Sequence, residues 1–169
     1  MTLFGHIGGG LLEASVTEKI LFKEEFSVAT LGIVVFLSIL PDLDGMLAFL
    51  FRNWRPGYKK LDHHDYITHT PIFYLCISIA VWVGLGKELS FLFFLLTMTH
   101  LLLDSYGTDD GIMWLWPISK RKFSIVSSNL HEGGVYGARY YLRYVRHLGS
   151  SIPELLLIVG GVVSVVWLK

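Results

Sequence analysis

The stretch VVFLSILPDLDGMLAFLF, residues 34–51, decides how the sequence is interpreted, because two carboxylates interrupt an otherwise lipid-like run. Asp42 and Asp44 follow Pro41, and the stretch contains no lysine or arginine. An ionisable side chain at the centre of a bilayer costs about 2.5–3.5 kcal/mol on insertion scales. The acids therefore need partners from elsewhere in the chain. A simpler interpretation is a helix cap after Pro41, since aspartate favours the N-cap position.

The composition around this stretch indicates an integral membrane protein. Of 169 residues, 53% are hydrophobic and 17% are charged, whereas soluble domains carry about 25% charged residues. A helix needs about 20 apolar residues to span a bilayer. Four segments approach that length: 26–40 with its continuation to 51, 71–85, 89–103 and 152–168.

The first 22 residues are less apolar than these segments. They contain Glu13, Glu18 and Lys19, and the triplet Gly8-Gly9-Gly10 predicts a break. We expect a half-buried helix there. The predicted fold is an all-α membrane bundle of about four transmembrane helices with this amino-terminal helix and an interfacial helix. It forms one domain over residues 1–169, with the motifs in 1–125 and the interfacial helix and last span in 126–169.

Basic residues predict the orientation. Ten of the 14 lysines and arginines lie in the two long loops that follow the first and third spans. The positive-inside rule then places both loops in the cytoplasm of a bacterial inner membrane. The net charge of zero gives no argument for a nucleic-acid partner. Cys76 is the single cysteine, so no internal disulfide can form.

Ligand-type side chains gather at one predicted membrane level. Asp42 and Asp44 end the first span, and His64 and His69 immediately precede the second. His100 and Asp104, at the end of the third span, are four residues apart and share one helical face. His100 and Asp104 could instead be a hydrogen-bonded pair that ties helices together, and His64 could simply face solvent.

A divalent metal would remove the penalty of burying these groups, because carboxylates and neutral imidazoles are its usual ligands. Zinc with one open coordination position lowers the pKa of its bound water towards 7, which suits hydrolysis. Two ions about 3.5–4 Å apart would suit attack on a phosphoester. We therefore expect zinc, as one or two ions.

Four motifs follow one another along the chain: FGH at 4–6, LPDLD at 40–44, HHDYITHT at 63–70 and THLLLDSYGTDDGIMWLWP at 99–117. Together they resemble the membrane-bound metal-dependent hydrolases, LexA-linked inner-membrane proteins considered distant relatives of zinc-dependent phospholipase C and the S1/P1 nucleases. The resemblance covers about residues 1–125. It implies metal-ligand roles for His6, Asp42, His69, His100 and Asp104, with Asp44 and His64 as their partners. The third motif departs from the family pattern, because Asp65 and Tyr66 stand where arginine and glycine are expected.

The segment YGARYYLRYVRH, residues 136–147, carries tyrosines at four-residue spacing beside a stripe of arginines. The simpler interpretation is an interfacial helix on the cytoplasmic leaflet. Alternatively, Arg139 or Arg143 could bind a substrate phosphate, because an arginine fork matches phosphate geometry.

The predicted function is a metal-dependent hydrolase that cleaves a phosphoester in a membrane lipid or lipid phosphate. Asp44 and His64 are the catalytic candidates, with Asp44 acting as a base for the attacking water or orienting that water. The alternative is a metal or proton transporter or a metal sensor, since intramembrane acids and histidines also mark ion pathways. A transporter would place some of these groups near the midplane.

Overall fold

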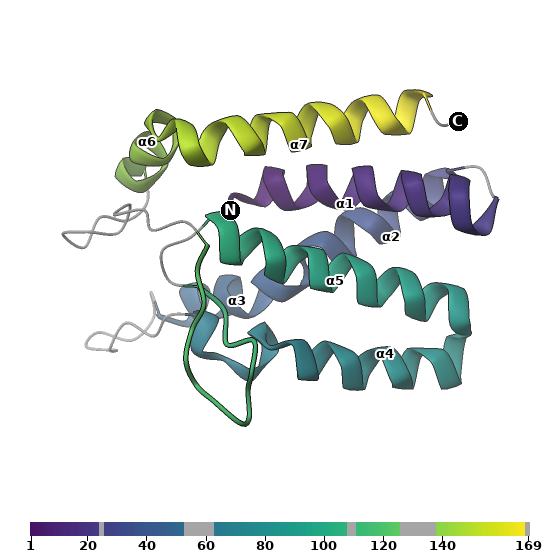
Figure 1. Cartoon of the computed structure of the whole chain (residues 1–169), viewed down its shortest axis with the longest axis horizontal. Coiled ribbons are helices and arrows are strands. Elements are labelled where there is room, and N and C mark those ends of the chain that lie inside the picture. The colour runs from purple at the N-terminus through teal and green to yellow at the C-terminus, as the bar shows by residue number, and fades with distance from the viewer. Residues whose placement is uncertain (24–25, 53–62, 108–110, 126–137, 168–169) are drawn as a thin grey trace.

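The computed structural model describes residues 1–23, 26–52, 63–107, 111–125 and 138–167, and most of them are helical (Figure 1). The only β-type pairing among them is an isolated bridge between Ile112 and Phe123, so the predicted all-α class is confirmed. The elements in chain order are α1 (Leu3–Thr17), the π-helical turn η1 (Glu18–Phe22), α2 (Val28–Ile39), the 3₁₀ turn η2 (Leu40–Asp42), α3 (Leu43–Arg52), the 3₁₀ turns η3 (His63–Asp65) and η4 (Ile67–His69), α4 (Pro71–Leu85), α5 (Lys87–Gly107), α6 (Ala138–Arg146) and α7 (Leu148–Trp167).

Three helical stretches are long and apolar enough to cross a membrane: Val28–Leu47, Lys87–Tyr106 and Leu148–Trp167. They match the first, third and fourth predicted spans. The second predicted span is α4, which is apolar but has only 15 residues, fewer than the roughly 20 that a bilayer needs. Large apolar side chains such as Val83 and Trp167 point outward and are more than four-fifths exposed, as expected for surfaces that meet lipid.

The helices lie side by side in the order α7, α1, α5 and α4, with α2 behind them (Figure 1). Helix α1 packs against α7 on one side and against α2 and α5 on the other, while α4 packs against α5. The interior between them contains Ala14, Val34, Leu96 and Leu101, each at most 1% exposed. The amino-terminal helix therefore lies inside the bundle.

The predicted break at Gly8-Gly9-Gly10 is wrong, because α1 runs through all three glycines. They are sites of close helix contact. A Cβ atom at Gly8 would lie 2.7 Å from the Cα of Ile158 in α7, and a Cβ atom at Gly10 would overlap Oγ of Ser38 in α2. Small residues allow the backbones of membrane helices to approach one another, and this packing outweighs the weak helix propensity of glycine.

Pro41 separates α2 from α3. Proline has no N–H to donate to the preceding turn, and the chain tightens into η2 before α3 begins at Leu43. This turn places Asp42 and Asp44 at the junction of the two helices. The junction lies at the end of the bundle where α4 begins and α5 ends (Figure 1).

Candidate metal centre

Four side chains from three parts of the chain converge at this end of the bundle. Asp42 lies in η2, His69 ends η4, and His100 and Asp104 lie one turn apart in α5. Each offers one ligand atom, and these atoms all lie within 4.8 Å of one another. The two histidines and Asp104 are at most 2% exposed. Two imidazoles and two carboxylates at this spacing can hold one divalent cation.

His100 has a fixed orientation. Its Nδ1 lies 2.7 Å from the backbone oxygen of Ser38, and a carbonyl oxygen can only accept, so Nδ1 carries the proton. Ser38 is among the last four residues of α2, whose carbonyls lack donors within the helix. The other ring nitrogen, Nε2, lies 3.0 Å from Oδ2 of Asp104 and 3.5 Å from Oδ1 of Asp42.

The contacts of this Nε2 atom fit a shared cation. It is fully buried and faces both carboxylates, that of Asp104 in its own helix and that of Asp42 in η2. When this nitrogen is deprotonated, its lone pair and the two carboxylate oxygens can all serve as metal ligands. A metal ion between them would satisfy all three, and carbonyl-anchored imidazoles are the usual arrangement around bound metals. The donor set therefore fits a metal.

His69 is oriented by Asp44. Its Nδ1 lies 3.1 Å from Oδ2 of Asp44, and the same oxygen accepts a hydrogen bond from the hydroxyl of Thr68. Its Nε2 lies 3.9 Å from Oδ1 of Asp42. A carboxylate bound to the far nitrogen of a histidine ligand fixes the ring and raises its basicity. This geometry fits the role that the family resemblance implies for Asp44, that of a partner of the metal ligands, and here it holds the ring of His69.

His6 and His64 approach Asp104 from other elements. Nε2 of His6, on α1, lies 3.0 Å from Oδ1 of Asp104, and Nε2 of His64, in η3, lies 3.6 Å from Oδ2. The ring of His6 stacks on that of His100 at a centroid distance of 3.8 Å. The amino group of Met1 also lies 2.8 Å from Oδ1 of Asp104. Both oxygens of Asp104 therefore face nitrogen atoms.

Comparison with known proteins identifies the family. The whole chain, residues 1–169, matches the family model described as YdjM inner membrane protein. The chain belongs to the YdjM inner membrane protein family. No curated protein and no solved structure matches it. Membership of the YdjM family and the apolar helices support the predicted inner-membrane location, while the predicted cytoplasmic side of the site stays a prediction.

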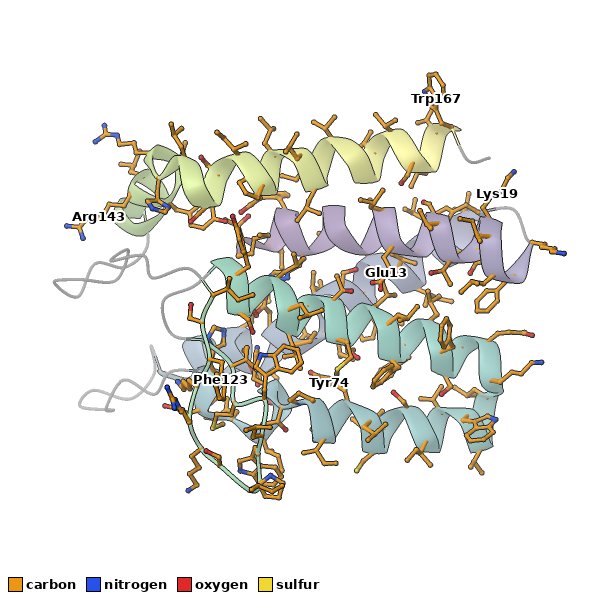
Figure 2. All side chains as sticks on the ribbon, viewed as in Figure 1. Glu13, Lys19, Tyr74, Phe123, Arg143 and Trp167 are labelled. Carbon is orange, nitrogen blue, oxygen red and sulfur yellow. The ribbon has the colours of Figure 1, made fainter. Side chains whose placement is uncertain are left out.

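The four histidines and three aspartates predicted for the site of this YdjM-family chain lie together. Asp42, His69, His100 and Asp104 form the ligand group, and Asp44, His6 and His64 contact it. Arg143 lies on the exposed side of α6 and points away from the bundle (Figure 2). The side chain of Arg139 lies outside the described residues. The substrate role of both arginines stays a prediction.

Sequence reasoning missed two groups that hold the ligands in place. Thr68 stands directly before His69 within HHDYITHT, so its position was visible although its contact with Asp44 was not. The carbonyl of Ser38 left no signal, because a backbone group carries no side-chain identity. Only the three-dimensional packing of α2 on α5 brings that oxygen to His100.

Proposed function

We propose that this protein is a membrane-embedded, metal-dependent hydrolase that cleaves a phosphoester in a lipid-type substrate. The proposal depends on one observation: the ligand atoms of two aspartates and two histidines from η2, η4 and α5 all lie within 4.8 Å of one another. Asp42, His69, His100 and Asp104 would hold the cation. Imidazole and carboxylate ligands suit zinc, and the site would hold one or two ions.

The residues of the chain have distinct tasks in this proposal. A bound divalent cation supplies Lewis acidity and lowers the pKa of a coordinated water towards 7. Asp44 keeps the ring of His69 in place through Nδ1. His64 lies beside Asp104 but outside the four-ligand group, and in this proposal it would give a proton to a leaving oxygen.

The surroundings of the site favour a lipid substrate. The side chains of Asp42 and Asp44 are 20% and 18% exposed, whereas those of the surrounding histidines and Asp104 are at most 3% exposed. A substrate would therefore approach past these two acids. Leu47, one turn beyond Asp44, and Ile67, two residues before His69, are exposed apolar side chains. A lipid phosphate combines an apolar part for these side chains with an anionic part for the metal.

A second candidate function is ion transport, and one observation favours it. Glu13, in the second half of α1, is partly buried (Figure 2) and lies within reach of Thr99 in α5. Acids within membrane helices mark ion pathways. The metal ligands themselves, however, lie at one end of the bundle, and a transporter would distribute them along its path.

Metal analysis and hydrolysis assays on the detergent-purified protein test the proposal. We expect bound zinc and hydrolysis of phospholipid or of a small phosphodiester. A chelator should remove the zinc and abolish the hydrolysis. Asp104→Asn should remove metal and turnover, whereas Glu88→Gln, an exposed acid at the other end of α5, should change neither. Absence of metal after zinc loading would refute the proposal. Bound metal without turnover, together with zinc flux into proteoliposomes, would support transport instead.

A further inference from the structure

Glu154 is a buried carboxylate in α7 that lies outside the metal site. It is 7% exposed and lies near the start of the third stretch apolar enough to span the membrane, Leu148–Trp167. An acid in such a position is costly unless donors satisfy it. Three donors do so: the backbone N–H of Thr2 at 3.2 Å, the hydroxyl of Thr2, and the hydroxyl of Tyr144.

These donors belong to α6, which precedes α7 in the chain, and to the residue that caps α1, which packs beside α7. Thr2 is the N-cap residue of α1 and makes no side-chain capping bond within its own helix. Glu154 takes both of its donors, so α7 stabilises the beginning of α1. Its negative charge also lies at the positive end of the α1 dipole. Tyr144 lies in α6 and is 2% exposed, so the carboxylate of Glu154 also connects α6 to the beginning of α1.

The beginning of α1 determines where His6 lies. The N–H of His6 donates to the carbonyl of Thr2 at 3.2 Å, which closes the first turn of the helix. From that turn the imidazole reaches Asp104 and stacks on His100. A change in the position of Thr2 would therefore move His6 relative to both.

We propose that Glu154 is a positioning residue for the metal centre: it anchors the first turn of α1 and so holds His6 against Asp104 and His100. The inference rests on the proposed metal site for its consequence, but the anchoring itself is independent of metal. The hydroxyl of Tyr144 donates to the same carboxylate. The packing of α6, the arginine-rich helix, is thereby linked to the geometry of His6.

Glu154→Gln is the test substitution, because glutamine keeps the volume and places an amide donor against groups that also donate. We expect amide hydrogen exchange in residues 2–8 to become at least about tenfold faster in the metal-free protein, since exchange follows local opening. Thr2→Ala, which leaves Glu154 intact, should have a smaller effect in the same segment. Ser164→Ala is the control, because Ser164 bonds only its own helix among the contacts described. Unchanged exchange in residues 2–8 of both test variants would overturn the proposal.

Cobalt binding tests the consequence for the site. Loss of a residue that orients a ligand typically costs about 10–100-fold in metal affinity. Glu154→Gln should weaken cobalt binding and alter its visible spectrum in the same way as His6→Ala. The double variant should be no weaker than His6→Ala alone, because both changes act through one side chain. Additive losses would show that Glu154 acts elsewhere and would overturn the proposal. If the wild-type protein binds no cobalt, the proposed function fails, and the exchange experiment alone decides the anchoring.

Discussion

Asp44→Asn distinguishes two roles for this acid: holding the ring of His69 and acting as the base. Oδ2 of Asp44 accepts hydrogen bonds from Nδ1 of His69 and the hydroxyl of Thr68. Asparagine preserves the shape and an acceptor oxygen but removes the charge. Hydrogen bonds to charged groups contribute about 1 kcal/mol more than neutral ones. Two such bonds amount to about 2 kcal/mol, which corresponds to about 30-fold in zinc affinity.

The assay is competition for zinc with a fluorescent chelator, combined with hydrolysis at limiting and saturating zinc. If Asp44 orients His69, zinc affinity should fall by about 30-fold and saturating zinc should restore most of the activity. Asp65→Asn is a matched control in the segment that carries His69, because Asp65 pairs with Lys122. An Asp44→Asn variant with unchanged zinc affinity would refute the orienting role. A loss of turnover that zinc cannot restore would then identify Asp44 as the base.

Three further predictions concern packing, metal-linked stability and substrate access. Gly8→Ala should destabilise the bundle by about 1–3 kcal/mol, because the added Cβ would meet the α7 backbone. Gly84→Ala, where a Cβ would meet no atom within 4 Å, should be neutral or stabilising. Equal unfolding midpoints for the two variants would contradict this prediction. Zinc at about 1,000 times its Kd should stabilise the protein by about 4 kcal/mol, and an Asp104→Asn protein that keeps this thermal shift would exclude the four-ligand site. Leu47→Gln should raise KM several-fold for a phospholipid in vesicles but not for a soluble phosphodiester. An equal rise for both would argue against substrate access past Leu47 and Ile67.

The four candidate metal ligands were predictable because two kinds of pattern agree. Hydropathy locates the ends of the apolar helices, and the spacing of His100 and Asp104 places them on one helical face. Asp42 and His69 stand at the ends of neighbouring apolar segments, so all four had to reach a similar depth. Membrane thickness thus supplies a constraint that a soluble protein of this composition would lack.

The sequence could not predict which helices contact each other, and the positioning groups depend on those contacts. Glu154 belongs to no motif, and its partners Thr2 and Tyr144 precede it by very different distances along the chain. The glycine triplet was misinterpreted for a related reason. Local propensity treats glycine as a helix breaker, whereas the packing of α1 against two neighbouring helices requires a residue without a side chain.

The same glycines connect the packing of the bundle to the chemistry of the site. Any side chain at Gly10 would overlap Ser38, so α1 and α2 are in direct contact at that residue. The hydroxyl of Ser38 donates to Val34 of its own helix, while its carbonyl oxygen accepts from His100. His6, one turn before Gly10 in α1, stacks on the ring of His100. A larger residue at position 10 would have to separate α1 from α2, and His100 would then lose either its carbonyl anchor or its stacked partner. The distance between two backbones, set by a residue with no side chain, therefore determines the orientation of a metal ligand on a third helix.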